Sequence, residues 1–155
     1  MQQLPATISK HWFGYVIIVG AGLLIAGLLG VASYSFYVNG LALELFAFTF
    51  FFAVVALLLT IVQIWVYSLS YVELTEAGIH VVNWRTLFVK TDVTTEWERV
   101  QDVSVATGST WALLFNYGTL VIQTAGTSQE LRMTMIPDAE YWQALIQANA
   151  SVSSN

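Results

Sequence analysis

Hydrophobic and polar positions follow one pattern in the first half of the chain and another in the second half. Residues 13–38 and 45–66 are apolar runs without a charged side chain. An α-helix rises about 1.5 Å per residue, so about 20 apolar residues cross the roughly 30 Å core of a bilayer. Both runs reach that length, and the pattern predicts two transmembrane helices, at about residues 13–38 and 42–67.

The connection between these two predicted helices is short. Asn39 and Gly40 form a turn dipeptide, and Glu44 follows them. Such a connection requires antiparallel helices, so we expect residues 12–70 to form a transmembrane hairpin after an N-terminal segment of residues 1–11. A cleaved signal peptide is the alternative interpretation of the first run, although a signal peptide has only about 7–15 apolar residues and no second run.

Beyond residue 70 the hydrophobic period changes to alternation. Residues 130–135 place Leu131, Met133 and Met135 on one face of a strand. Further strands are indicated by alternation or by β-branched and aromatic residues at positions 79–84, 87–93, 103–105 and 119–124. Five or six short strands with tight turns predict a small antiparallel barrel or a pair of sheets.

A final helix is predicted after Pro137. Asp138 and Glu140 suit its positive N-terminal end, and apolar residues follow at helical spacing. We expect this helix to close the open end of the sheet structure. The small polar residues 149–155 are expected to form a disordered tail.

Charge separates the two halves as hydropathy does. Glu44 is the only charged residue between Trp12 and Val72, and the 155-residue chain has a net charge of −5. The second half is acidic, which argues against a nucleic-acid binder and against strong electrostatic docking to anionic lipid. Lys10 and the later basic residues lie on one side of the hairpin, so the positive-inside tendency places both termini in the cytoplasm.

Side chains for catalysis or cofactor binding are scarce. The chain has no cysteine, and its two histidines lack metal-ligand spacing. No phosphate-binding glycine loop and no nucleophile with a neighbouring base can be recognised. We therefore expect a protein that is not an enzyme and that has no cofactor, no metal and no small-molecule substrate.

Three segments of the second half resemble the bacterial PH domain family. They are Tyr-Val-Glu-Leu-Thr-Glu-Ala-Gly-Ile at 71–79, Glu-Arg-Val-Gln-Asp-Val at 98–103 and Asn-Tyr-Gly-Thr-Leu-Val-Ile-Gln-Thr-Ala-Gly at 116–126. The resemblance implies a pleckstrin-homology-like module over residues 71–148. Such a module is an all-β, seven-stranded bent barrel closed by a C-terminal helix, and in this family it often follows two transmembrane helices.

Six family-motif positions are candidate site residues: Arg99, Gln101, Asp102, Asn116, Tyr117 and Gly118. The first three could form a binding surface. Alternatively, an Arg–Asp pair and side-chain bonds to the backbone could fix the bend before Val103. The other three fit turn chemistry, since Asn and Gly accept positive φ.

A second candidate site is the apolar run at residues 111–115, which interrupts a loop region. One interpretation is a short helix inserted into the mouth of the barrel. The alternative is that Trp111, Leu114 and Phe115 contact the bilayer interface or a partner protein.

Small residues form a stripe on the first predicted helix at Gly22, Ala26 and Gly30. Such a stripe lets two backbones approach closely. It could be a homo-oligomer interface, or it could receive bulky side chains of the second helix, such as Phe48, Phe52 or Leu59.

Two functional hypotheses follow. The first is an integral, multi-pass protein of the bacterial inner membrane whose cytoplasmic PH-like domain serves protein–protein interaction, as a scaffold for a membrane partner or as an oligomer with itself. The second is a lipid-binding module that senses the membrane by apolar insertion. Neither involves nucleic acid.

Overall fold

The chain forms two compact units. One is Phe13–Tyr67, and the other combines Met1–Trp12 with Ser68–Asn155. We call them the helical unit and the β unit. The computed structural model describes residues 4–40, 43–125 and 130–153.

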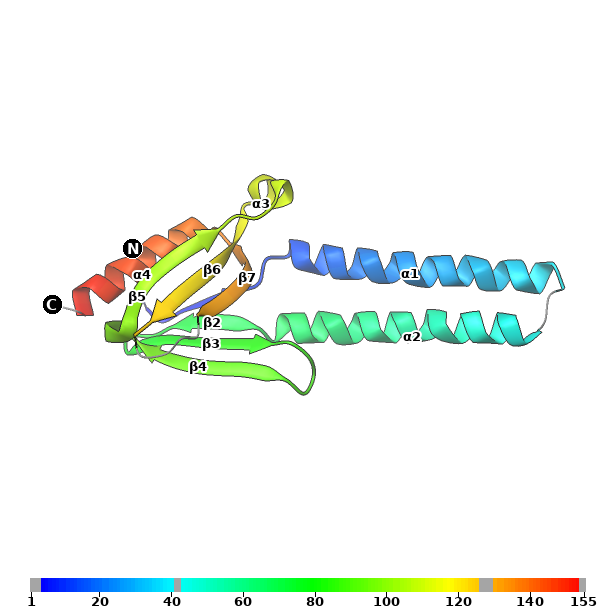
Figure 1. Ribbon diagram of the computed structural model, residues 1–155, viewed down its shortest axis with the longest axis horizontal. Coiled ribbons are helices and arrows are strands. Elements are labelled where there is room, and N and C mark those ends of the chain that lie inside the picture. Colours follow the sequence, from blue (N-terminus) through cyan, green and yellow to red (C-terminus); the bar gives the residue numbers. More distant parts are fainter. Residues whose placement is uncertain (1–3, 41–42, 126–129, 154–155) are drawn as a thin grey trace. The chain divides into compact units, whose positions relative to one another are not determined.

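The helical unit consists of α1 (Phe13–Val38) and α2 (Leu43–Ser68), drawn in blue to green in Figure 1. The two predicted apolar helices are thus confirmed, and both are long and apolar enough to cross a membrane. Only 11% and 6% of their most apolar windows are buried. A core helix of a water-soluble fold would be mostly buried, so these helices present their apolar side chains outward.

Small residues bring α1 close to α2. A Cβ added to Gly22 would lie 2.0 Å from Oγ1 of Thr60, and Ala26 is buried as well. A Cβ on Gly30 would meet no atom within 4 Å. The first two positions of the predicted stripe are therefore buried, and Gly22 packs against the small residue Thr60 instead of the bulky ones expected.

The packing face of α1 differs from the predicted stripe at its two ends. Near the start of α1, Gly14 lies against Tyr67. Near its end, the Ser33 hydroxyl donates to the carbonyl oxygen of Phe46 at 3.2 Å. The expected partners Phe48, Phe52 and Leu59 are exposed.

The β unit contains two antiparallel sheets. The first has the order β1-β2-β3-β4 and the second has the order β5-β6-β7 (Figure 1). The strands are β1 (Ala6–Ser9), β2 (Tyr71–Leu74), β3 (Gly78–Trp84), β4 (Lys90–Glu96), β5 (Val100–Ala106), β6 (Tyr117–Thr124) and β7 (Leu131–Pro137). The helical elements are the 3₁₀ turn η1 (Trp97–Arg99), α3 (Thr110–Phe115) and α4 (Ala139–Ser153).

The seven strands and the C-terminal helix agree with the expected PH-like arrangement, but the predicted closed barrel is wrong. Within the described residues, β4 pairs with β3 alone, and η1 leads from β4 to β5. The polar side chains of β4 are mostly exposed, so little apolar surface draws this strand toward the second sheet. The two sheets meet through their apolar faces instead.

One hydrophobic core joins the two sheets and α4. It includes Ile8 from β1, Val72 from β2, Trp97 from η1, Leu120 from β6 and Ile146 from α4. The indole nitrogen of Trp97 donates to the carbonyl oxygen of Thr75 at 3.0 Å, so the polar atom of this buried ring is satisfied. Burial of these side chains supplies the main driving force for folding of the unit.

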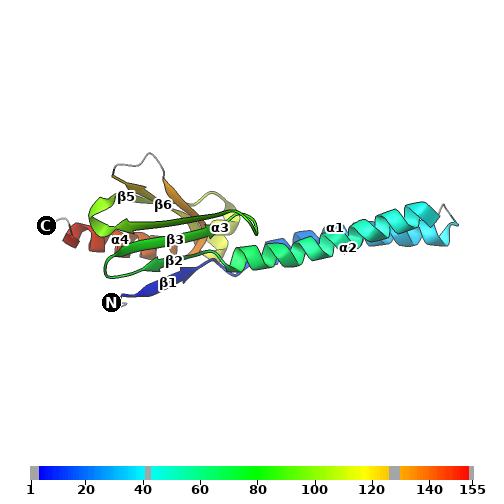
Figure 2. The same ribbon diagram turned by 90° about the horizontal axis from the view of Figure 1, so that it is seen from below.

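The first strand of the β unit precedes the helical unit in the chain. β1 pairs with β2 in the register Ala6↔Leu74 to Ser9↔Tyr71, and β1, β2 and β3 lie side by side in Figure 2. Sequence analysis predicted no strand in residues 1–11. The hairpin is therefore an insertion between the first two strands of this fold.

Two further expectations for the β unit need correction. α4 continues to Ser153, although a disordered tail was expected from Asn149, because Ala150 packs on the core and the Asn149 side-chain amide donates to the carbonyl oxygen of Leu145 at 2.8 Å. In β7 the alternation ends at Met135, which has a φ of 60°. Consequently Ile136 is fully buried in place of Met135.

Candidate functional site

Two short links connect the units, and both join the first sheet at the same end. The first link (residues 10–12) follows Ser9, and the second link (residues 69–70) precedes Tyr71. Ser9 and Tyr71 are paired across β1 and β2, and Tyr71 is paired with Val82 of β3. This end of the β unit, which we call the link end, therefore carries the two connections to the helical unit.

The first link is held by contacts inside the β unit. The backbone N–H of His11 donates to the carbonyl oxygen of Met135 at 2.6 Å, and its ring lies 5.5 Å from the ring of Tyr117. Burial lowers the pKa of His11, and the nearby Asp138 carboxylate opposes that change. Burial also lowers the pKa of Lys10.

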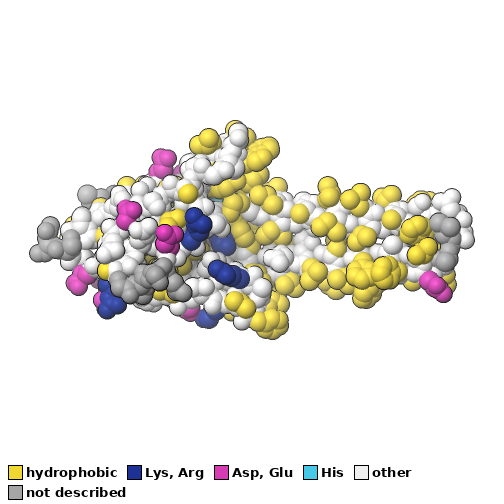
Figure 3. Space-filling view, viewed as in Figure 1, with side chains coloured by type: hydrophobic (Ala, Val, Ile, Leu, Met, Phe, Trp, Pro, Cys, Tyr) yellow, Lys and Arg dark blue, Asp and Glu magenta, His cyan; other side chains and the backbone are white. Residues whose placement is uncertain are grey.

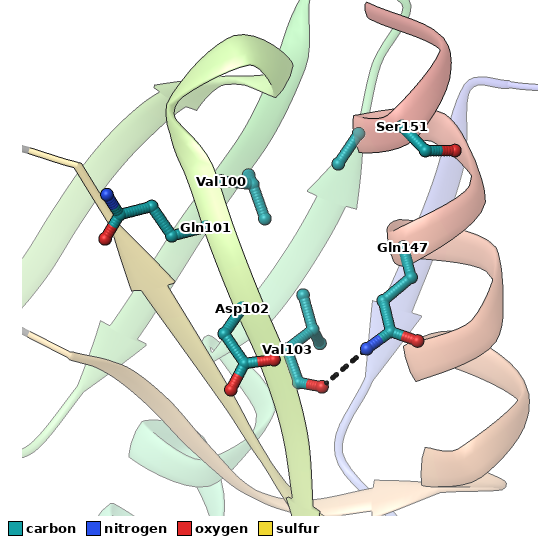
Figure 4. Close-up of a pocket in the computed structure, with 7 residues that line it drawn as sticks. Val100, Gln101, Asp102, Val103, Gln147 and Ser151 are labelled. Carbon is teal, nitrogen blue, oxygen red and sulfur yellow. Dashed lines mark hydrogen bonds between the residues drawn. The ribbon is translucent and has the colours of Figure 1, made fainter. Parts of the chain in front are cut away.

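The motif positions Gln101 and Asp102 line a small pocket between β5 and α4 (Figure 4). The pairing of β5 with β6 shifts between Val100 and Asp102, which gives Gln101 no partner residue of its own in the ladder. Gln101 points away from α4, whereas Gln147 points from α4 toward the strand. The volume of 220 Å³ is below the roughly 300–1,000 Å³ of typical small-molecule sites.

The contacts around this pocket dock α4. The side-chain amides of Gln143 and Gln147 donate to the carbonyl oxygen of Val103 at 2.7 and 3.0 Å. Arg99 lies 3.4 Å from a carboxylate oxygen of Glu96, so it forms an ion pair with that glutamate instead of the expected pair with Asp102. The bend before Val103 is thus formed by η1, the irregular pairing and the glutamine contacts.

Of the motif positions Asn116, Tyr117 and Gly118, only Asn116 has the positive φ expected of a turn, whereas Tyr117 and Gly118 begin strand β6. Asn116 caps α3 in the left-handed conformation, with a φ of 54°. Its side-chain amide donates to the Asp138 carboxylate, and the Asp138 N–H donates back to the Asn116 carbonyl oxygen at 3.1 Å. A Cβ on Gly118 would lie 2.9 Å from that of Ala139, so glycine permits α4 to approach β6.

The short helix predicted at residues 111–115 exists as α3, but it is not inserted into the sheets. Only Ala112 is buried, while Trp111, Leu113 and Leu114 are exposed. Phe115 stacks on the Trp111 ring at 6.1 Å and meets the Trp12 ring edge-on at 5.7 Å. α3 therefore lies beside the first link with its apolar side chains outward.

A second apolar protrusion was missed by sequence analysis. Residues 87–93 were expected to be one strand, but β4 begins at Lys90, and residues 85–89 form the turn between β3 and β4. We call this turn the β3–β4 tip. Leu87, Phe88 and Val89 are exposed, and hydrophobic side chains gather at the tip and on α3 in Figure 3. Consecutive apolar residues without alternation could have signalled the tip.

Charged groups on β3 and β4 form an exposed network. Asp92 accepts from Nζ of Lys90 at 2.7 Å and lies 2.8 Å from Nε2 of His80. These two bonds lower the pKa of Asp92, the bond from Lys90 contributing most. Within residues 4–40, 43–125 and 130–153, no group of three or more His, Cys, Asp or Glu could hold a metal ion.

The geometry defines a class of protein: a PH-like domain of two antiparallel sheets and a C-terminal helix, interrupted after its first strand by an apolar helical hairpin. A family model described as Bacterial PH domain matches residues 14–150. The chain belongs to this family, which confirms the resemblance noted in its sequence. The matched region begins after β1. No significant match was found to a curated protein or to a solved structure.

Proposed function

We propose that this chain is a non-enzymatic integral membrane protein that presents its PH-like domain for protein–protein contact. In this proposal α1 and α2 cross the bacterial inner membrane, and the β unit lies on its cytoplasmic face. The exposed apolar surfaces of both helices support the membrane location.

The position of β1 supports a topology with an even number of crossings. β1 precedes α1, and its partner β2 follows α2. Two strands of one sheet must lie on the same side of a membrane, so the hairpin crosses it twice or not at all. Cleavage after α1, as for a signal peptide, would also remove Ile8 from the core, and Ile8 is only 2% exposed.

The distribution of basic residues supports the cytoplasmic side. Lys10 and every basic residue after the hairpin belong to the β unit, whereas the described residues nearest the connection of α1 to α2 carry only the acidic Glu44. Positive residues are retained in the cytoplasm.

The main observation that supports the proposed protein–protein contact is the open edge of β4. This seven-residue strand is paired on one side only within the described residues, and it lies at the border of its sheet in Figure 1. An edge strand offers backbone N–H and C=O groups to an additional strand from another chain. Thr91 and Thr94 are exposed on β4, so neither side chain is enclosed by the core.

The charges on this edge restrict which strand can be added. Lys90 and Asp92 neutralise each other, and Glu96 is paired with Arg99. A partner strand must therefore bring polar or complementary side chains to β4. An uncharged, strongly apolar segment would leave these charges without water, which is unfavourable.

Photo-crosslinking in native membranes tests this proposal. The chain has no cysteine, so Thr94→Cys introduces a single site for a benzophenone maleimide. Gln123→Cys is the matched control, because Gln123 is exposed on the central strand of the second sheet. We expect a specific adduct from position 94, of twice the chain mass for a second copy or of another mass for a different protein. Equal labelling at both positions, or no adduct at position 94, would overturn the edge assignment.

A further inference from the structure

The link end of the β unit carries two apolar protrusions. At the β3–β4 tip, Phe88 is 93% exposed and Val89 is 53% exposed. On α3, Leu113 is 74% exposed and Leu114 is 69% exposed. Contiguous exposed apolar side chains mark contact surfaces, since single scattered ones are common but such groups are not.

The shape of the tip is fixed by hydrogen bonds. The N–H of Arg85 donates to the carbonyl oxygen of Val89 at 2.9 Å. The hydroxyl oxygen of Thr86 accepts from the N–H of Val89 at 3.1 Å and from that of Phe88 at 3.3 Å. The turn is closed by these bonds, so the outward position of Phe88 follows from its backbone.

Each protrusion adjoins one of the two links. The N–H of Trp84, which immediately precedes the tip, donates to the hydroxyl of Ser70 in the second link at 3.0 Å. Phe115 of α3 contacts the ring of Trp12 in the first link at 5.7 Å. These contacts are independent of each other, and both place apolar side chains next to a connection to the helical unit.

We propose that the β3–β4 tip and α3 insert into the interfacial region of the same bilayer that α1 and α2 cross. This inference rests on the proposed membrane anchoring. The links have three and two residues, and at about 3.5 Å per residue neither reaches more than about 15 Å. The link end is thereby kept at the bilayer surface, where Trp111 and Trp12 have the rings preferred at a lipid–water boundary.

The charges around the protrusions fit lipid contact. Residues 84–91 and 107–117 contain no Asp or Glu, although the chain has 10 acidic residues. Arg85 is exposed beside the tip, and a long basic side chain can extend to the headgroups while its stem covers apolar surface. The few basic residues make insertion an apolar effect, so its salt dependence is expected to be small.

Site-directed spin labelling of the full chain in vesicles tests the insertion. Single cysteines are placed by Phe88→Cys at the tip and by Leu113→Cys on α3. The matched control is Glu98→Cys in η1, an exposed position at the opposite end of the sheet. Leu28→Cys and Leu58→Cys report on the helices. The labelled proteins are reconstituted in vesicles of phosphatidylethanolamine and phosphatidylglycerol. The accessibility of each spin label to oxygen and to a water-soluble nickel chelate is then measured from the relaxation of the label.

We expect the ratio of oxygen to nickel accessibility at positions 88 and 113 to exceed that at position 98 several-fold. It should not change between about 0.1 and about 1 M salt. Water-like ratios at 88 and 113 with lipid-like ratios at 28 and 58 would overturn the insertion while the anchor stands. Low accessibility to both reagents at 88 and 113 would mean a protein contact, which also overturns it. Water-like ratios at 28 and 58 would overturn the membrane anchor itself.

Discussion

The helical unit and the β unit place their apolar side chains in opposite ways. Leu28 and Val31 of α1 are exposed, whereas Ile8 and Val72 are enclosed in the core of the β unit. The helices satisfy their backbone groups internally and need only a small packing face. The sheets require a core to hold them together. The tip and α3 are exceptions, because they expose apolar residues in the unit that otherwise buries them.

The largest expected effect concerns β1, the edge strand of the first sheet. Ile8→Ala removes a core side chain, and such changes destabilise proteins by about 2–5 kcal/mol. Thr7→Ala, at the exposed neighbouring position, should change stability by no more than about 0.5 kcal/mol. Denaturant unfolding of the full chain in detergent measures both. If Ile8→Ala changed the free energy of unfolding as little as Thr7→Ala, β1 would contribute nothing to the stability of the β unit.

A smaller effect is expected inside the helical unit. Gly22→Leu places atoms where Thr60 lies, and overpacking of this kind costs about 1–3 kcal/mol. Gly30→Leu is the matched control, because open space surrounds the position. Helix melting followed by circular dichroism in micelles distinguishes the two. A larger loss of helix stability for Gly30→Leu than for Gly22→Leu would instead indicate that this face of α1 packs against another copy of the chain.

The first link should make stability depend on pH. The pKa of His11 is lowered in the folded state from its ordinary 6.5. At a pH between the folded-state pKa and the unfolded-state pKa, the unfolded state therefore binds more protons than the folded state. Stability is therefore full above about pH 6.5 and falls as the pH decreases through the folded pKa. Unfolding measured from pH 7.5 downward should show this decrease. His11→Gln should reduce it, and an unchanged pH profile in that variant would exclude His11 as the source.

The smallest stability effect is expected at the tip. Phe88→Ser should change the unfolding free energy by no more than about 0.5 kcal/mol, because the side chain contributes almost nothing to the core. Thermal unfolding in detergent gives this value. A loss comparable to that of Ile8→Ala would show that Phe88 is a core residue and would remove the contrast between the tip and the rest of the β unit.

Sequence patterns predicted the elements whose signals are local. The two apolar runs are long and free of charge, and the turn at Asn116 needs residues that accept positive φ. β1 was missed because its four residues contain one core position, Ile8, and its partner strand lies beyond the whole hairpin. Such pairing leaves no local period in the sequence.

The directions of exposed side chains were harder to predict than the elements. Apolar spacing identified a helix at α3 but could not distinguish insertion among the strands from exposure, since both use the same residues. At the tip, Phe88 and Val89 have high strand propensity, so these residues fitted the strand predicted over residues 87–93 and concealed the turn. The same lack of a local signal left the open edge of β4 unrecognised, because barrel closure depends on contacts between distant strands.

The insertion of the hairpin between β1 and β2 has a consequence for biosynthesis. Ribosomes make β1 before either helix, yet its partner strand is not synthesised until residues 10–70 have been made. In the proposed membrane topology, the nascent amino terminus therefore remains unassembled while α1 and α2 enter the bilayer. In that topology the first sheet is completed after integration, and a chain whose helices failed to insert together would leave the β1-facing edge of β2 unpaired and open to proteolysis.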